Sequence, residues 1–150
     1  MSNKLVSRWL LGGLDTCVVL LARMGFSESF IRFAIVGVSG FCWDTGTFYL
    51  LRLYTNPYAA ATCSFIVAAT ANWALNRLWT FRHHNHAAAH VQWAKFMTAN
   101  IIGFAANRGT LFILISRSEF FYSQPVLAII AGSIAGLSFN YFLSKRYVFS

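Results

Sequence analysis

Four long apolar stretches leave this chain few ways to fold. They cover residues 33–53, 57–75, 96–115 and 126–143, and each is close to the ~20 residues with which a helix crosses a hydrocarbon layer of ~30 Å. The chain is 57% hydrophobic and 11% charged, whereas soluble domains carry about 25% charged residues. The sequence therefore predicts an all-α integral membrane protein, with four transmembrane helices in one domain over residues 31–150.

The chain also contains an internal duplication. NWALNRLWTF at 72–81 aligns with NYFLSKRYVF at 140–149, and RFAIVGVSGFCWDTGT at 32–47 aligns with KFMTANIIGFAANRGT at 95–110. The offset is 68 residues for the first alignment and 63 for the second. Such self-similarity predicts a repeated unit, here two helical hairpins over residues 32–81 and 95–149. Because each unit has two helices, the hairpins enter the membrane in the same orientation and are parallel repeats about an axis along the membrane normal.

The distribution of Lys and Arg predicts the orientation. Arg52 and Arg117 fall on one side of the predicted membrane, and nine cations fall on the other: Lys4, Arg8, Arg23, Arg32, Arg77, Arg82, Lys95, Lys145 and Arg146. Because cytoplasmic segments carry the excess of Lys and Arg, both termini are predicted to be cytoplasmic. The net charge of +8 does not indicate nucleic acid binding, because the cations are spread between apolar runs and no groove-reading motif is present.

Residues 1–30 predict an amphipathic helix lying on the cytoplasmic face. Apolar residues recur at near-helical spacing between Arg8 and Arg23, but Asp15 interrupts them and the stretch is too short to span a membrane. No small-residue cleavage site follows, so a signal peptide is not indicated either.

Helix ends are marked by local signals. Ser27 or Ser29 is expected to cap the first long helix, and Asn56-Pro57 is expected to form a tight turn after it. Residues 82–91 predict a polar loop between the hairpins, and residues 116–125 join the last two helices. The three cysteines are odd in number and lack metal-type spacing, so we expect small buried hydrophobic side chains.

Small and polar residues recur every four positions in the second and fourth apolar stretches. The two series are Ala60, Ser64, Ala68, Asn72 and Asn76, and Ala128, Gly132, Gly136, Asn140 and Ser144. Small residues at this spacing let helix backbones approach closely in lipid, so the alanines and glycines predict helix packing. An amide in hydrocarbon needs a partner. Asn72 and Asn140 therefore either join helices across the pseudo-axis or face a polar substrate path, and both alternatives stay open.

Two charges fall near the middle of predicted spans. Asp44 lies 12 residues after Arg32 and Arg108 lies 13 after Lys95, which is about 18–20 Å along each helix at 1.5 Å per residue. A charge near mid-membrane normally faces the bundle interior or an aqueous cavity and has a partner. Because Asp44 aligns with Asn107, we expect Asp44 and Arg108 at nearly the same height, paired directly or through water. The pair is either structural or part of a substrate path.

Three cations stand where the second and fourth stretches reach the cytoplasmic surface. Arg77, Lys145 and Arg146 are either topological charges beside an aromatic belt or a site for a lipid phosphate, which the planar fork of an arginine fits. His86 and His90 are four residues apart, but no acidic or cysteine ligand accompanies them, so no metal site is expected. The sequence has no nucleotide-binding loop or catalytic triad, so we expect neither an enzyme nor a cofactor.

Several of these motifs together resemble the GtrA-like proteins. They are FAIVG after a basic residue, the NxxxNRxWTF decad, a basic-Phe pair at Lys95-Phe96 and the closing NYxxSKRYVF. The resemblance runs from about residue 30 to 149. The family pattern falls on Asn72, Asn76, Arg77, Trp79 and Phe81, and on Asn140, Lys145, Arg146 and Phe149.

The resemblance implies a flippase of the bacterial inner membrane. Such a protein carries a polyprenyl-phosphate-linked monosaccharide, for example undecaprenyl phosphate glucose, from the cytoplasmic to the outer leaflet for O-antigen-type glycosylation of cell-surface polysaccharide. Its partners are a membrane glycosyltransferase of the same pathway and membrane lipid. Since four short helices form a thin wall around a lipid headgroup, a homodimer is favoured. The expected headgroup-binding residues are Asn72, Asn76, Arg77, Asn140, Lys145, Arg146, Asp44 and Arg108.

Two alternatives from other functional classes stay open. The first is a proton-coupled exporter of small molecules in which Asp44 carries the proton. The second is a scaffold that does not transport and instead recruits or stabilises a polyprenyl-phosphate glycosyltransferase, with the small-residue series and the N-terminal helix as its working surfaces.

Overall fold

The structure is a computed structural model that describes residues 13, 15–16, 18–23, 25–84 and 87–150. The described part is helical and contains no strand. Its elements are α2 (Glu28–Leu51), α3 (Pro57–Leu75), η1 (Asn76–Thr80), α4 (Ala89–Arg117), α5 (Glu119–Ser123), α6 (Pro125–Leu143) and η2 (Ser144–Val148). The elements η1 and η2 are π-helical turns that continue α3 and α6.

Three of the described helical segments are long and apolar enough to cross a membrane. They are Pro57–Thr80, Ala89–Arg117 and Pro125–Val148. The remaining predicted span, residues 33–53, corresponds to α2. This helix has 24 residues and so has the necessary length. Asp44 and the glycines and threonines around it lower the hydropathy of α2, so its passage through the membrane stays a prediction.

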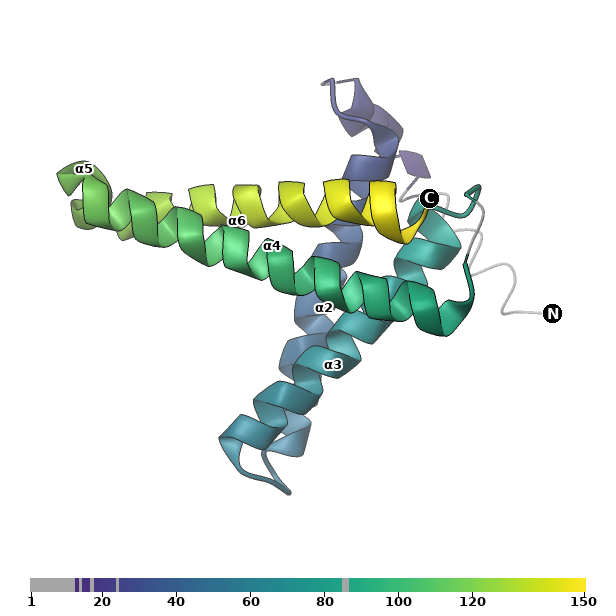
Figure 1. Ribbon diagram of the computed structural model, residues 1–150, viewed down its shortest axis with the longest axis horizontal. Helices are drawn as coiled ribbons and strands as arrows, with labels where there is room; N and C mark the ends of the chain where they lie inside the picture. Colours follow the sequence, from purple (N-terminus) through teal and green to yellow (C-terminus); the bar gives the residue numbers. More distant parts are fainter. Residues whose placement is uncertain (1–12, 14, 17, 24, 85–86) are drawn as a thin grey trace.

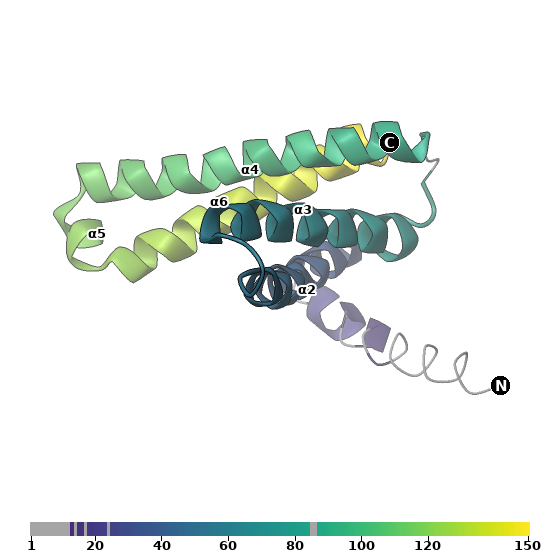
Figure 2. The same cartoon turned by 90° about the horizontal axis from the view of Figure 1, so that it is seen from below.

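The helices form two antiparallel pairs. Figure 1 shows α2 running beside α3 and α4 running beside α6, with the short α5 at the far end of the second pair. The two pairs are inclined to each other and come together near the end of the molecule that holds the C-terminus, while their connecting turns lie apart (Figures 1 and 2). The molecule is therefore two hairpins joined mainly at one end.

Local signals fix the ends of the first hairpin as the sequence predicts. Ser27 is the N-cap of α2, and its Oγ accepts a hydrogen bond from the backbone N–H of Phe30 at 3.3 Å. Asn56 caps α3 by accepting from the N–H of Ala59 at 2.9 Å, and Pro57 occupies the first helical turn, where its missing N–H costs nothing. The predicted cap and turn are both confirmed.

The second hairpin differs from prediction at its ends. α4 begins at Ala89, inside the predicted loop 82–91, and α5 fills part of the predicted connection 116–125. The π-helical turns were not predicted either. Each closes with a hydrogen bond from residue i to i−5, from Phe81 N–H to Asn76 O at 2.8 Å and from Phe149 N–H to Ser144 O at 2.9 Å.

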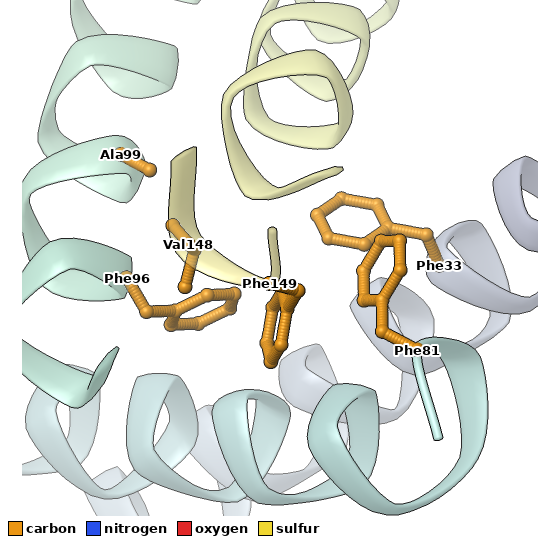
Figure 3. Packing of buried hydrophobic residues seen from close by; sticks show 6 residues of the cluster. All are labelled: Phe33, Phe81, Phe96, Ala99, Val148 and Phe149. Atoms are coloured by element: carbon orange, nitrogen blue, oxygen red, sulfur yellow. The ribbon is translucent and has the colours of Figure 1, made fainter. Parts of the chain in front are cut away.

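The hydrophobic core lies where the hairpins meet. Phe81 and Phe149 stack with ring centroids 4.6 Å apart, and Figure 3 shows Phe96 beside Phe149 and Phe33 beside Phe81. The centroids of Phe33 and Phe81 are 6.3 Å apart, and those of Phe96 and Phe149 are 6.1 Å apart. In the sequence alignment Phe33 matches Phe96 and Phe81 matches Phe149, so the core joins equivalent residues of the two repeats.

Within each hairpin a glycine makes room for an asparagine. A Cβ placed on Gly40 would lie 2.7 Å from Cγ of Asn72, and one on Gly103 would lie 2.7 Å from Nδ2 of Asn140. The two contacts are equivalent under the sequence alignment. The small-residue series also face inward, since Ala60, Ser64, Ala68, Asn76, Ala128, Gly132, Gly136 and Ser144 are all buried. The packing role predicted for the alanines and glycines is confirmed.

The outward surface of the helices is apolar. Large side chains such as Phe41, Phe112 and Phe142 are well exposed, which is expected of surfaces that face lipid and unusual in a soluble monomer. Cys42 and Cys63 are free and also exposed. The expectation that the cysteines are buried is therefore wrong for these two, because their positions on α2 and α3 turn away from the hairpin contact. Cys17 lies outside the described residues.

An N-terminal segment packs against the first hairpin. The described residues of 13–22 are helical, and we call them the N-terminal segment. Val18 is 0% exposed and lies in a cluster with Ile31, Val36 and Trp79. The predicted amphipathic helix of residues 1–30 lies largely outside the described residues.

Candidate functional site

An open cavity of about 560 Å³ lies between the two hairpins. Its apolar wall includes Phe41 of α2, Phe65 of α3 and Phe104 of α4. Its polar lining comes from the second hairpin and consists of Asn100, Asn107, Arg108, Ser133 and Asn140. The cavity thus brings a cation and three amides to one place among apolar helices, which is a typical composition for a site that binds a polar ligand.

Among the described residues, Arg108 is the only cation that lines this cavity. Its guanidinium lies over the ring of Phe104, 5.4 Å from the centroid, a favourable cation–π geometry. In the described part of the chain it makes no ion pair or hydrogen bond. The charge of Arg108 is therefore available to an anionic ligand.

The amides extend this polar lining along α4 and α6. Asn100 donates from Nδ2 to the carbonyl of Phe96 at 2.9 Å, which leaves its oxygen unused in that bond. Asn140 has a buried Oδ1 with no hydrogen-bond partner. From Asn100 to Arg108 the helix rises about 12 Å at 1.5 Å per residue, so the polar groups form a track and not a single point.

A second pocket contains two of the predicted phosphate ligands. It has a volume of about 580 Å³ and is lined by Tyr141, Phe142, Lys145, Arg146, Tyr147 and Ser150. The ammonium of Lys145 lies 5.7 Å from the ring centroid of Tyr141. The Tyr141 hydroxyl shares hydrogen bonds with Ser29 at 2.6 Å and Ser27 at 3.0 Å. We call this the cationic pocket.

The guanidinium of Arg77, the third predicted phosphate ligand, is hydrogen-bonded to other residues of the chain. Its Nη1 donates to the side-chain oxygen of Gln92 and to the carbonyl of Ala87 at 3.3 Å, and its guanidinium lies 5.9 Å from the ring centroid of Trp73. Trp73 donates from Nε1 to the same Gln92 oxygen at 3.2 Å. Arg77 thus connects the end of α3 to the start of α4.

Gln92 was missed by the sequence analysis. It is 0% exposed, and it aligns with Ser29 at the offset of 63 residues. Ser29 contacts Tyr141, the counterpart of Trp73. The alignment of Gln92 with Ser29, a polar residue just before the first repeat, was the available signal. The polar residue at this place in each alignment meets the aromatic residue of the other repeat.

Four buried oxygens lack a hydrogen-bond partner at equivalent positions of the repeats. They are Oδ1 of Asn72 and Asn140, and Oδ1 of Asn76 and Oγ of Ser144. Asn76 and Ser144 are each 1% exposed and begin the two π-helical turns, a backbone feature frequent at functional sites. Among the described residues none of these oxygens accepts a hydrogen bond from another helix, so the two alternatives for Asn72 and Asn140 stay open at their amide nitrogens.

Asp44 and Arg108 were predicted to pair directly or through water, and the direct ion pair is wrong. Asp44 Oδ1 accepts a hydrogen bond from Ser64 Oγ at 2.6 Å, and both ion pairs among the described residues involve Arg32. α2 packs on α3 and turns Asp44 toward Ser64, whose hydroxyl satisfies the carboxylate. Arg108 lines the cavity between the hairpins, and Asp44 is not among the residues that line it.

The described residues contain no group of three His, Cys, Asp or Glu side chains placed to hold a metal ion. His90 is exposed, and His86 lies outside the described residues.

Comparison with known proteins identifies the chain at the family level. The sequence profile described as GtrA/DPMS, transmembrane domain, matches residues 32–149, which include both hairpins and both π-helical turns. No curated protein matches the chain significantly. The match supports a membrane protein in polyprenyl-linked sugar metabolism, and the chain belongs to the GtrA/DPMS transmembrane domain family.

Proposed function

We propose that this protein carries a polyprenyl-phosphate-linked monosaccharide, such as undecaprenyl phosphate glucose, from the cytoplasmic to the outer leaflet of the bacterial inner membrane. The product serves O-antigen-type glycosylation of the cell surface. Membership of the family supports a role in polyprenyl-linked sugar metabolism, and the cavity between the hairpins supports the transport step.

The cavity is the observation that carries the proposal. A sugar phosphate does not cross hydrocarbon unaided, because its hydroxyls and its charge would lose their hydration. The cavity offers Arg108 to the phosphate and the amides of Asn100, Asn107 and Asn140 to the sugar hydroxyls. Its volume of about 560 Å³ falls within the 300–1,000 Å³ range that is usual for small-ligand sites. The cavity is open, which lets the polyprenyl tail stay in lipid.

The cationic pocket supplies a contact for the phosphate before it reaches the cavity. Lys145 and Arg146 line it, and Lys145 stands five residues beyond Asn140, about 7.5 Å along the helix axis. A headgroup that leaves the cationic pocket therefore meets the cavity amides after a short movement. Arg108 then holds the phosphate deeper in the membrane.

The membrane arrangement is part of the proposal. In this proposal α2 crosses the membrane as well, so that there are four spans. Both termini are cytoplasmic, and the hairpins are parallel repeats. The common core of Phe33, Phe81, Phe96 and Phe149 supports this (Figure 3), because equivalent ends of both hairpins contribute to it. The nearby cations then lie on the cytoplasmic side, as the usual excess of Lys and Arg requires.

We assign the protein no chemistry of its own and no cofactor. A membrane glycosyltransferase makes the lipid-linked sugar and another uses it, so these enzymes are the expected partners. We also propose a homodimer, because the cavity is open between two hairpins that are inclined to each other (Figure 1). A second copy can complete the wall around the headgroup.

A vesicle assay tests the transport step. The purified protein is reconstituted with a short-chain polyprenyl-phosphate glucose, and a membrane-impermeant reagent measures how fast the sugar changes leaflet. The wild type should accelerate the exchange. Arg108→Gln should slow it at least about tenfold, which corresponds to about 1.4 kcal/mol of lost stabilisation.

Arg117→Gln is the matched control, because Arg117 is an exposed cation at the end of the same helix and does not line the cavity. It should leave the exchange rate unchanged. Vesicles in which the wild-type protein leaves exchange at the rate of empty vesicles would contradict the proposal. Copurification with a glycosyltransferase in that case would support the scaffold alternative.

A further inference from the structure

The two repeats present equivalent outer faces beside their π-helical turns. On the first repeat this face consists of one side of α2 together with Trp79 and Thr80 of η1. On the second repeat the corresponding face consists of one side of α4 together with Tyr147 and Val148 of η2. Arg32 on the first face aligns with Lys95 on the second.

The face on the first repeat is closed by the N-terminal segment. Asp15 of that segment forms an ion pair with Arg32 at 3.1 Å, and the Arg32 guanidinium lies 5.8 Å from the ring centroid of Trp79. Val18 is buried against Val36 and Trp79. An apolar groove with a cation at its edge is thus filled by an apolar side chain and a carboxylate.

The face on the second repeat is open. It carries a pocket of about 470 Å³ lined by Lys95, Thr98, Ala99, Ile102, Leu143, Tyr147 and Val148. Lys95 is exposed and forms neither of the ion pairs of the described residues, both of which belong to its counterpart Arg32. Tyr147 is 57% exposed, whereas its counterpart Trp79 is 9% exposed. The second repeat therefore has an equivalent groove with a cation at its edge, and none of the described residues of this chain fills it.

We propose that this pocket is the lateral entrance for the lipid substrate, with its phosphate at Lys95 and the first isoprene units against Ala99, Ile102 and Leu143. The inference rests on the proposed function, since it names the part of the substrate that the pocket receives. Asp15 on the first repeat marks the place that an anion takes beside the cation of such a groove. A phosphate with an apolar chain supplies, in one molecule, the anion and the apolar group that Asp15 and Val18 supply on the first repeat.

The position of the pocket favours a lipid over a second copy of this chain. Its walls belong to Ala89–Arg117 and Pro125–Val148, which are both candidate membrane spans, so the pocket faces lipid by default. The obvious protein occupant is the N-terminal segment of another copy. That segment is already bound to Arg32 of its own chain through the ion pair of Asp15. To enter the pocket of another copy, it would have to give up this ion pair and the burial of Val18.

Tyr147 connects the entrance to the proposed path. It lines both this pocket and the cationic pocket of Lys145 and Arg146. A phosphate at Lys95 therefore passes one side chain to reach those two cations. Because the N-terminal segment closes the equivalent face of the first repeat, we expect the lipid to enter on the second repeat.

Binding of a short-chain polyprenyl monophosphate, measured by native mass spectrometry of the full chain in detergent, tests this inference. Lys95→Gln should weaken binding about tenfold, or about 1.4 kcal/mol. The exposed cation Arg82 lies outside the pocket, so Arg82→Gln should leave the affinity unchanged. Ile102→Trp should fill the groove and weaken binding at least about tenfold. Ile101→Trp is its matched control, because Ile101 is exposed and does not line the pocket.

Equal affinities for Ile102→Trp and Ile101→Trp would overturn the entrance. Phosphatidylglycerol that binds as tightly as the polyprenyl monophosphate would also overturn it, because the pocket would then hold a general acidic lipid. Failure of the proposed function looks different. In that case the monophosphate binds with the pattern expected above, while vesicles containing the wild-type protein show no acceleration of sugar exchange.

Discussion

Substitution of Gly40 by alanine tests how closely α2 and α3 approach each other. The added Cβ would lie 2.6 Å from Oδ1 and 2.7 Å from Cγ of Asn72, whereas ordinary contact begins at 3.4 Å. The whole amide, and not only its tip, must therefore move by the better part of an ångström or the helices must separate. Overpacking of this kind costs about 1–3 kcal/mol, so Gly40→Ala should lower the free energy of unfolding by that amount.

Asn72→Ala should relieve the clash. The Oδ1 of Asn72 is buried without a hydrogen-bond partner, so removing it gives up no bond at that atom. The double variant Gly40→Ala/Asn72→Ala should regain most of the lost stability, which gives a coupling free energy of about 1–3 kcal/mol between residues in contact. Gly46→Ala is the control, because Gly46 is on the same helix and a Cβ there meets nothing within 4 Å.

Reversible unfolding in mixed detergent micelles, followed by helical circular dichroism, measures these free energies. Losses that simply add in the double variant, to within about 0.5 kcal/mol, would refute the contact between Gly40 and Asn72. The vesicle assay on the same proteins adds a second reading. If Asn72 lies on the headgroup path, the double variant should regain stability while its transport stays impaired.

Three other predictions concern two charged contacts and the orientation of the chain in the membrane. Asp44→Asn and Arg108→Gln should have additive effects on unfolding, because the two residues do not touch, and a coupling above about 0.5 kcal/mol would show that they do interact. Arg77→Lys should lower the free energy of unfolding by about 1–2 kcal/mol, since an ammonium does not reproduce the fork that now reaches two acceptors; unfolding titrations of the variant check this. Labels placed at Asn56 and Ser118 should react with an impermeant reagent from outside the cell, while tags on both termini should be reached only from the cytoplasm, and a periplasmic C-terminus would overturn the four-span arrangement.

Much of the fold could be predicted from the sequence because lengths and local signals determine it. The apolar runs set the number of long helices and their order in the chain. Ser27 and Asn56 mark helix starts by capping hydrogen bonds that need no tertiary partner, and Pro57 suits a first helical turn. The alignment of Gly40 with Gly103 identifies equivalent positions. Which side chain meets each glycine depends on the rotation of the facing helix about its own axis, and sequence spacing does not fix this rotation.

The candidate site was harder to predict for the same reason. Asp44 and Arg108 are at similar depths along their helices, and depth alone suggested an ion pair. The contact with Ser64 shows that the direction in which Asp44 points matters as much as its depth. The π-helical turns begin at Asn76 and Ser144, and they also left no readable signal, because one extra residue in a helical turn changes neither the composition nor the hydropathy of the segment.

The two repeats share an architecture but use their matching cations differently. Arg77 and Lys145 are equivalent in sequence, and each lies over an aromatic ring at about the same distance, 5.9 Å and 5.7 Å. Arg77 is held by Gln92 and Ala87, whereas Lys145 lines an open pocket. An arginine satisfies two acceptors at once through its fixed fork, while a lysine is a flexible point charge that can follow a moving anion. Arginine therefore suits the first repeat, where it joins α3 to the start of α4. Lysine suits the second repeat, along which we propose that the lipid phosphate travels.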